Sequence, residues 1–392
     1  MQKTYDAVVA GHICLDMHPI IEGGDAYQLQ ELFVPGGLVN LSGVSLSGGG
    51  VVSNTGFALR KLGVAVLPVT SIGDDAFGGI LSSIVREHTG ITIPKKAGIT
   101  TSYSIILSVK DVDRIIFHDP AGNNAFDLAD IDFEKIRRAK LFHFGYPPLM
   151  KKMYENGGKM LAEMFRRIYD YGVVTSIDMS LPDHASESGQ VDWLDVMQKT
   201  LPYVDIFLPS AEEALYVFDR EEFNRVKHDA GARDFTSALD LEKVCALGQR
   251  ILDMGCAVAG VKCGEKGMYI QTASAKRLAR MEQTLGTKPA EWANQALFQE
   301  SYHVADFKSA LAAGDTAIAG FLAAALLGKN VFDAARAACM AGALCCAAYD
   351  AVSALPDMGT LMKLIDKNPD KNRYDALETA FQFDWERKTW TR

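Results

Sequence analysis

Short hydrophobic runs alternate with longer segments of helical spacing along most of the chain. The runs have the length and continuous apolar character of strands that are buried on both faces of a sheet. They are residues 6–11, 64–72, 141–145, 173–178, 204–208 and 257–262. Segments with helical spacing of apolar residues lie between them, at 51–62, 76–88, 151–171, 191–200 and 240–254. This alternation predicts an α/β fold, a three-layer sandwich with a mostly parallel central sheet and helices on both faces.

Two segments interrupt this order. Residues 14–47 are rich in Gly, Pro and Leu and have no helical period, and residues 101–118 alternate apolar and polar side chains like a half-exposed hairpin. We expect both to form a small β-sheet that stands off the main sheet as a lid. With this lid, residues 1–392 are predicted to form one domain.

Three further segments fit neither pattern. Residues 219–238 and 274–300 are polar or charged, which predicts surface insertions. The charged and aromatic tail from Asn368 onward receives no assigned role. Residues 309–328 and 332–349 are strongly apolar, but Asp315 would be costly in a lipid bilayer, so two helices buried in the protein core are predicted.

The composition limits the kinds of partner that the chain is expected to bind. Of 392 residues, 48% are hydrophobic and the net charge is −9, with acids and bases interspersed, which argues against nucleic acid or an anionic membrane as the main partner. The seven cysteines form no C-x-x-C pair and the N-terminus lacks a signal-peptide pattern. We therefore expect a cytoplasmic protein. The eight histidines are scattered without an H-E-x-x-H motif, so no tight zinc site is predicted, and His143 is expected to lie in the core.

The strongest candidate for chemistry is the sequence Ala312-Ala313-Gly314-Asp315 at the start of an apolar helix. Small residues allow close approach to a ligand, and the free amides and dipole of a helix start attract an anion. An aspartate there can accept a proton from an attacking hydroxyl group. Alternatively, Asp315 could simply cap the helix.

Polar side chains near the N-terminus suit a polyhydroxy ligand. Gly49 and Gly50 precede a predicted helix that carries Asn54, and Asp16 follows the first predicted strand, where α/β sheets bind ligands. A dinucleotide-binding loop is excluded because its third glycine is missing. A plain flexible loop and a solvated turn acid are the alternatives.

Two later strand ends add candidate residues. Ser210 and Glu213 lie where a strand runs into a helix, and Glu213 could act on Mg²⁺ through water or merely stabilise the helix start. Lys262, Gly264 and Gly267 form a tight turn between two strands, a candidate cradle for nucleotide phosphates or ribose.

In order and spacing, these motifs resemble the ribokinase-like (PfkB) family of small-molecule kinases. The resemblance also includes Gly73-Asp74-Asp75-x-Phe77-Gly78 and runs from about residue 5 to 357. It implies an α/β sandwich with a β lid, ATP and Mg²⁺ as phosphoryl donor, and a sugar or nucleoside as acceptor.

The resemblance also implies roles for individual residues. Asp315 matches the catalytic base, and Ala312, Ala313 and Gly314 match the anion hole. The residues that match acceptor-binding positions are Asp16, Gly49, Gly50, Asn54 and Asn124. Glu213 matches a magnesium-linked glutamate, and the nucleotide-side positions are Ser210, Lys262, Gly264 and Gly267. Lids of this kind often pair between subunits, which implies a homodimer.

The sequence departs from the family pattern at two positions. Ser309 replaces an aspartate that helps to bind a monovalent cation in many members, so the use of potassium is left open, and Ser210 stands where asparagine is commoner. The lid segments offer only Lys110 and Arg114 as cations, which favours an uncharged sugar. A nucleoside kinase of the same fold, a sugar-binding protein of this fold with weak or no activity and a nicotinamide-dependent dehydrogenase are the alternatives.

Overall fold

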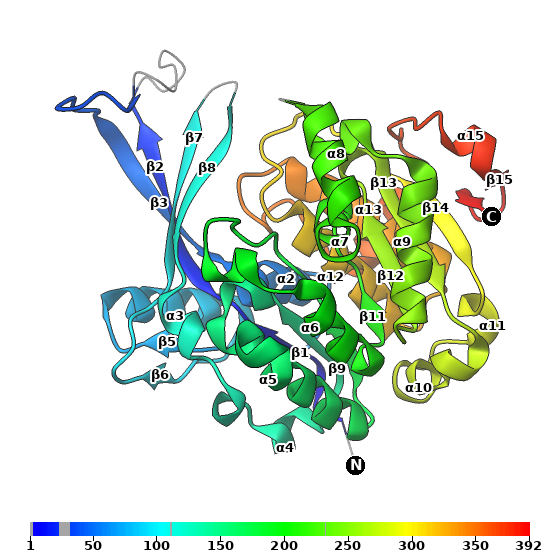
Figure 1. Ribbon diagram of the computed structural model, residues 1–392, viewed down its shortest axis with the longest axis horizontal. Helices are drawn as coiled ribbons and strands as arrows, with labels where there is room; N and C mark the ends of the chain where they lie inside the picture. Colours follow the sequence, from blue (N-terminus) through cyan, green and yellow to red (C-terminus); the bar gives the residue numbers. More distant parts are fainter. Residues whose placement is uncertain (1–2, 23–31, 110–111, 232) are drawn as a thin grey trace.

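The computed structural model describes residues 3–22, 32–109, 112–231 and 233–392. Its centre is a ten-stranded sheet in the order β15-β16-β14-β13-β12-β11-β10-β9-β1-β4 (Figure 1). Neighbouring strands are parallel from β4 to β12, namely β4 (Val66–Val69), β1 (Tyr5–Gly11), β9 (Ala139–Gly145), β10 (Val174–Ile177), β11 (Ile206–Phe207) and β12 (Val258–Lys262). The remaining strands are antiparallel, namely β13 (Gly267–Thr272), β14 (Ala296–Glu300), β16 (Thr389–Thr391) and β15 (Gln382–Asp384). The predicted mostly parallel sheet is confirmed.

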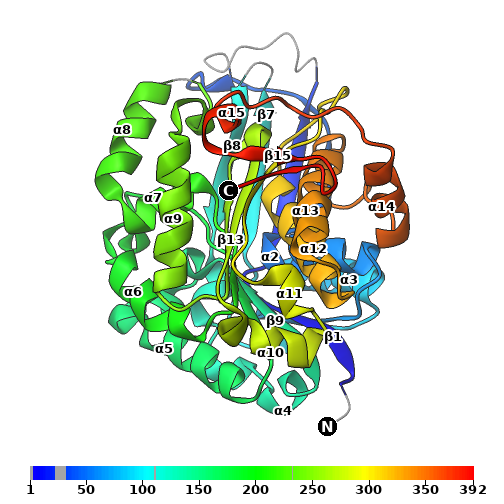
Figure 2. The same cartoon turned by 90° about the vertical axis from the view of Figure 1, so that its right-hand side faces the viewer.

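Helices cover both faces of this sheet, which is seen edge-on between two helical layers in Figure 2. One layer contains α5 (Lys151–Asp170), α6 (Trp193–Thr200), α7 (Ala211–Phe218), α8 (Arg220–Ala230) and α9 (Leu241–Asp253). The other contains α2 (Gly50–Lys61), α3 (Ala76–Thr89), α12 (Ala313–Leu326), α13 (Val331–Cys346) and α14 (Met358–Asp366). The remaining α-helices are α4 (Phe133–Ile136), α10 (Ala275–Leu285), α11 (Pro289–Trp292) and α15 (Leu377–Ala380). The three-layer architecture is confirmed.

The continuous apolar character of the strands follows from burial on both faces. In β1, Ala7 and Val9 pack into the core on the α2 and α12 side, whereas Val8 and Ala10 pack into the core on the α5 side. Successive side chains of a strand point to opposite faces, so both sets must be apolar. Burial of each large apolar side chain stabilises the fold by about 1.5–3 kcal/mol.

Helices α12 and α13 form the apolar pair that the sequence predicted. Ile318, Phe321 and Leu322 of α12 are buried, and a Cβ atom on Gly320 would lie only 2.6 Å from the carbonyl oxygen of Ala337 on α13. Glycine therefore lets the two helices pack closely. Within the described part of the chain, no helix combines the length and hydropathy that a membrane crossing requires.

The lid is a separate four-stranded sheet in the order β3-β2-β7-β8, which projects from the body in Figure 1. Its strands are β2 (Cys14–Ile21), β3 (Leu41–Gly49), β7 (Tyr103–Val109) and β8 (Val112–Asp119). This arrangement confirms the lid predicted from residues 14–47 and 101–118, as far as they are described. Exposed apolar side chains lie on it, among them Val44, Leu46, Ile116 and Phe117.

The prediction that residues 274–300 form a surface insertion is wrong. Leu278, Met281 and Leu285 of α10 are buried at helical spacing, and β14 lies inside the central sheet with four of its five residues buried. Charged residues between these apolar positions hide the pattern. Residues 219–238 likewise do not lie wholly on the surface, because Phe223 and Val226 of α8 are buried.

The tail from Asn368 onward has a structural role. It supplies β16, which pairs with β14, and β15, which pairs with β16, and so extends the central sheet at that edge. The predicted strand at 64–72 divides into β4 and β5 (Ile72–Gly73), and β5 pairs with β6 (Lys95–Lys96) in a small sheet of its own. The predicted helix at 151–171 corresponds to α5, with non-helical backbone at Glu155–Gly158.

Candidate active site

The start of α12 has an unusual backbone. Ala312, the N-cap residue, has φ 60° and ψ 8°, a left-handed conformation that costs an alanine about 1–2 kcal/mol. The amide of Ala313 donates to the carbonyl of Ala310 over 3.2 Å. Among the described residues, the amides of Gly314 and Asp315 have no hydrogen-bond acceptor. These two amides can bind an anion at the positive end of the helix dipole.

The carboxylate of Asp315 is buried and contacts side chains outside its own helix. The carboxylate accepts hydrogen bonds from the Tyr146 hydroxyl at Oδ1, from Thr55 Oγ1 at Oδ1 over 3.3 Å, and from Asn54 Nδ2 at Oδ2 over 3.1 Å. Burial raises the pKa of Asp315, and these three donors act in the opposite direction. Because the side chain makes no capping hydrogen bond, the interpretation of Asp315 as a simple helix cap is wrong.

A cavity of about 400 Å³ lies on one side of the α12 start. Asp16, Ser47, Asn54 and Ala312 belong to its lining. Burial raises the pKa of Asp16, although the thiol of Cys14 donates a hydrogen bond to its carboxylate over 3.1 Å.

The predicted glycines make room for polar groups beside this cavity. A Cβ atom on Gly49 would lie 2.2 Å from Oδ2 of Asp16. Gly50 has φ +79°, and a Cβ atom there would lie 2.5 Å from Nδ1 of His12. Any larger residue would therefore displace the side chains at the inner end of the lid.

A second cavity of about 520 Å³ lies on the other side of the α12 start. Ala313 and Gly314 line it together with the predicted residues Lys262, Gly264 and Gly267. Its wall toward α12 and α13 is apolar and includes Ala317, Ala338 and Ala343. Gly267 has φ +119°, and a Cβ atom there would meet the carbonyl oxygen of Gln299 at 2.0 Å, so this turn requires glycine.

Lys262 joins this second cavity to a group of acids. Its Nζ lies 3.2 Å from Oδ1 of Asp178, and both side chains are largely buried. Burial acts to lower the pKa of Lys262, but the carboxylates of Asp178, Glu213 and Asp315 outweigh it and raise that pKa. The ammonium group is therefore positively charged, and it partly balances three acids around the α12 start.

Glu213 and Ser210 lie beside Lys262 at the start of α7. The Ser210 amide donates to Oε2 of Glu213 over 2.7 Å, and the Glu213 amide donates to the Ser210 hydroxyl over 3.1 Å. This reciprocal pair is a capping box, so Glu213 does stabilise the helix start. Its role toward magnesium stays a prediction.

Residues 21–358 match the pfkB family carbohydrate kinases. The chain belongs to this family. It is therefore a phosphotransferase, and the geometry above belongs to a pfkB-family kinase.

Individual relatives agree with this assignment. An uncharacterized sugar kinase of Archaeoglobus fulgidus is 25% identical over 299 residues, which cover 76% of this chain and 98% of the relative. A probable fructokinase-2 of Arabidopsis thaliana is 30% identical over 116 residues, which cover 26% of this chain and 35% of the relative.

Solved structures show the same fold. The ribokinase of Thermotoga maritima has a TM-score of 0.65 at 18% identity and covers 92% of this chain and 99% of its own. The nucleoside kinase of Methanocaldococcus jannaschii has a TM-score of 0.63 at 15% identity, covering 94% of this chain and 100% of its own.

Sequence reasoning missed three polar residues of this kinase, Thr55, Tyr146 and Asp178. Tyr146 directly follows the predicted strand at 141–145, and Asp178 ends the one at 173–178. Side chains at the carboxyl ends of parallel strands gather at one edge of a sheet, the signal that identified Asp16. A search for polar residues at the carboxyl end of every predicted strand finds both Tyr146 and Asp178.

Other candidate residues lie outside the two cavities. Asn124 accepts a hydrogen bond from the Lys151 amide over 3.0 Å and does not line the 400 Å³ cavity, so its acceptor-binding role stays a prediction. The Ser309 hydroxyl accepts a hydrogen bond from the Leu311 amide over 3.0 Å. His143 is buried, with Nδ1 3.0 Å from Oγ of Ser176, which confirms a core histidine.

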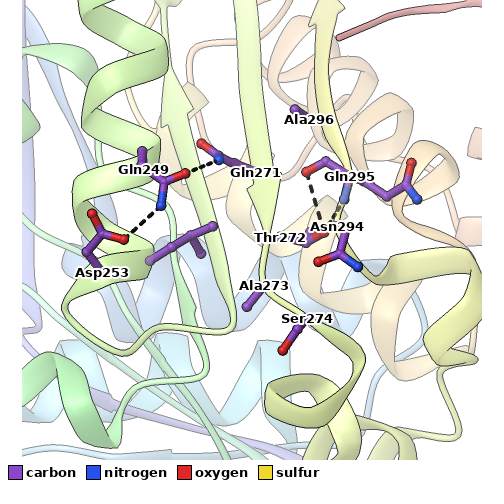
Figure 3. Close-up of a pocket in the computed structure, with 10 residues that line it drawn as sticks. Gln249, Asp253, Gln271, Thr272, Ala273, Ser274, Asn294, Gln295 and Ala296 are labelled. Carbon is purple, nitrogen blue, oxygen red and sulfur yellow. Dashed lines mark hydrogen bonds between the residues drawn. The ribbon is translucent and has the colours of Figure 1, made fainter.

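A third hollow of this kinase, shown in Figure 3, is a different kind of site. It lies between α9 and the end of β13, and several of its polar groups bind one another. Gln271 donates to Gln249 over 2.7 Å, Gln249 donates to Asp253 over 2.7 Å, and the Gln295 amide donates to Thr272 over 2.9 Å. Because these groups are mutually satisfied, we assign no ligand to it.

Proposed function

We propose that this kinase transfers the γ-phosphoryl group of ATP to a hydroxyl group of a small sugar. The observation that carries the proposal is the position of the α12 start between two cavities. Ala312 lines the 400 Å³ cavity, whereas Ala313 and Gly314 line the 520 Å³ cavity. An acceptor in the first cavity and a nucleotide in the second would meet at Asp315 and the two free amides.

Asp315 would act as the general base. Its Oδ1 already receives two hydrogen bonds and its Oδ2 one, so the carboxylate has a fixed orientation. Burial raises its pKa, which makes it a better proton acceptor for the hydroxyl of the sugar. The amides of Gly314 and Asp315 would stabilise the negative charge of the transferred group.

The residues of the second cavity fit a nucleotide. The apolar wall of small side chains suits a flat base, and Lys262 supplies a positive charge beside Gly264, Gly267 and the α12 start. ATP with Mg²⁺ would supply the phosphoryl group and partial neutralisation of its charge. We assign Glu213, with Ser210 beside it, to the magnesium side of this cavity.

An uncharged sugar is the acceptor that the first cavity favours. Lys61 belongs to its lining, but so do the acids Asp16, Glu87 and Asp350, so no net positive charge awaits a phosphorylated substrate. Lys110 lies outside the described residues, and the side chain of Arg114 is not described either. The names of the sugar kinase and fructokinase relatives support a sugar. A nucleoside is the alternative acceptor, because a nucleoside kinase has the same fold.

A coupled assay of ADP release tests this proposal. Pentoses, hexoses, sugar acids, sugar phosphates and nucleosides would be offered with ATP and Mg²⁺ to the native chain, to Asp315→Asn and to the surface control Asp183→Asn. We expect one uncharged sugar to be turned over, with kcat about 10²–10⁴-fold lower in Asp315→Asn.

Other outcomes reject parts of the proposal. Turnover of nucleosides alone selects the nucleoside kinase, and turnover of sugar phosphates alone rejects the uncharged acceptor. Full activity of Asp315→Asn rejects the general base. Sugar binding in a calorimeter without any turnover indicates a binding protein.

Two wider expectations belong to the same proposal. The exposed apolar side chains Val44, Leu46, Ile116 and Phe117 on the lid support a homodimer formed through the lids. Light scattering on the purified protein measures this directly. We also propose a cytoplasmic location, supported by the odd number of cysteines and the absence of a C-x-x-C pair.

A further inference from the structure

Three metal-ligating side chains meet where the lid joins the body. His12 follows β1, Cys14 begins β2, and His118 lies near the end of β8. One ligand atom from each lies within 4.8 Å of the other two, and within the described ranges this is the one such group of three His, Cys, Asp or Glu residues. The sequence hides the cluster because 106 residues separate His12 from His118.

The two imidazole rings face each other through the same nitrogen. Nε2 of His12 lies 3.1 Å from Nε2 of His118, with the rings tilted by 50°. Two such atoms either share a single proton or direct both lone pairs at one cation. In a tetrahedral zinc site, two nitrogens at about 2.0–2.1 Å from the ion are roughly 3.3 Å apart. The observed separation is therefore close to that of two zinc ligands.

The surroundings orient these ligands. Oγ of Ser104 lies 3.1 Å from Nδ1 of His118 and 3.4 Å from Sγ of Cys14, so one hydroxyl fixes both side chains. A hydrogen bond to the second ring nitrogen is typical of histidines that bind metals. His12 is 2% exposed, and its Nδ1 has no hydrogen-bond partner in the described structure, so the imidazole ring has hydrogen-bond contact with His118 alone among the described residues.

We propose that His12, Cys14 and His118 bind a zinc ion through the two Nε2 atoms and the Cys14 thiolate, with water in the fourth position. Two imidazoles and a thiolate suit zinc, whereas Mg²⁺ prefers oxygen ligands, so this site differs from the magnesium side of the nucleotide cavity. On binding, the Cys14 thiol releases its proton to solvent and gives up its hydrogen bond to Asp16. The ion would fasten lid strands β2 and β8 to the end of β1.

Cobalt is the most direct probe, because Co²⁺ occupies zinc sites and is coloured. The whole 392-residue chain, cleared of metal by a chelator, would be titrated with Co²⁺ in excess Mg²⁺. We expect one equivalent to produce intense visible bands of tetrahedral coordination and a thiolate-to-cobalt charge-transfer band in the near ultraviolet, and Zn²⁺ to abolish both. This measurement needs no variant and does not depend on kinase activity.

Variants then assign the ligands, with zinc affinity measured by competition with a chromophoric chelator. We expect Cys14→Ser and His118→Gln to weaken zinc binding by roughly a hundredfold or more, and Ser104→Ala by about tenfold to a hundredfold. Cys256→Ser, at a buried thiol far from the cluster, should bind zinc like the native chain. Absence of a thiolate band in the native protein, or native affinity in Cys14→Ser and His118→Gln, overturns the proposal. The cluster is then a hydrogen-bonded link between lid and body.

Discussion

The side-chain amide of Asn54 donates a hydrogen bond of 3.1 Å to the carboxylate of Asp315, although 261 residues separate the two along the chain. Asn54 lies in the first half of α2, and Asp315 lies in the first turn of α12. The two helices pack side by side against the same face of the sheet (Figure 2). This contact places a residue of the acceptor cavity directly on the proposed base.

Loss of this contact should impair catalysis. Asn54→Ala removes a hydrogen bond to a charged group, worth about 1.5–3 kcal/mol, so we expect kcat/KM to fall roughly tenfold to a hundredfold. Steady-state kinetics with the accepted sugar measures the change. Thr55→Ser keeps the neighbouring hydroxyl and should behave like the native chain. A native kcat/KM in Asn54→Ala, with an unchanged melting temperature, would show that Asn54 does not assist Asp315.

Tyr146 should set the pH dependence of the reaction. Its hydroxyl donates to Oδ1 of Asp315 and stabilises the ionised form, in opposition to burial, which raises the pKa. Tyr146→Phe removes the donor, so the pKa of Asp315 should rise further. Because the base must be deprotonated, the acidic limb of the profile of kcat/KM against pH should move to higher pH. The distant control Tyr171→Phe should leave the acidic limb in place. An acidic limb that also stays in place in Tyr146→Phe contradicts this role.

Gly49 should be required for acceptor binding rather than for folding. A Cβ atom at this position would lie 2.2 Å from Oδ2 of Asp16, whereas one on Gly43 in the same strand would meet only Cδ1 of Ile20 at 3.9 Å. We expect Gly49→Ala to raise KM for the sugar by about tenfold or more, since displacement of Asp16 would remove the hydrogen bond that we propose it makes to the ligand. Gly43→Ala is the matched control and should leave KM unchanged. Equal KM values in the two variants would argue against the acceptor role of Asp16.

Asp75 should stabilise the fold in a pH-dependent manner. Its carboxylate accepts hydrogen bonds of 2.7 Å from the amides of Gly78 and Thr101 and from the Thr101 hydroxyl, which joins the start of α3 to the entry into β7. Burial acts to raise the pKa of Asp75, but these hydrogen bonds outweigh it and lower that pKa. A lowered pKa gives stability that is fully present above the unfolded value of about 4 and is lost as the pH falls through the folded value.

Urea unfolding of Asp75→Asn at several pH values tests this expectation. At neutral pH the variant should lose about 0.5–2 kcal/mol, the usual contribution of an N-cap residue. The difference from the native chain should begin to shrink as the pH falls below about 4, where the unfolded carboxylate is protonated first, and should go on shrinking until the native carboxylate is protonated as well. A difference that does not change with pH would mean that the charge of Asp75 contributes nothing.

Much of this architecture was readable from local pattern. The continuous apolar runs at 6–11 and 141–145 correspond to β1 and β9. A strand that is buried on both faces needs apolar side chains at successive positions, so it can be recognised from the sequence. By contrast, residues 274–300 were misjudged. Their apolar positions are separated by charged ones, and only the neighbours in space show that α10 packs on the core and that β14 lies inside the sheet.

The active-site prediction shows the same division. The glycines, Asp16, Asp315 and Lys262 belong to short motifs whose backbone demands are local, so the sequence by itself was enough to propose them as site residues. Tyr146 and Asp178 have only their places at the ends of predicted strands to mark them, and His12, Cys14 and His118 carry no motif. Only the packing of distant strands and helices brings these side chains together. Their environment is formed by segments that lie far apart in the sequence, and the order of residues does not show which of these segments meet.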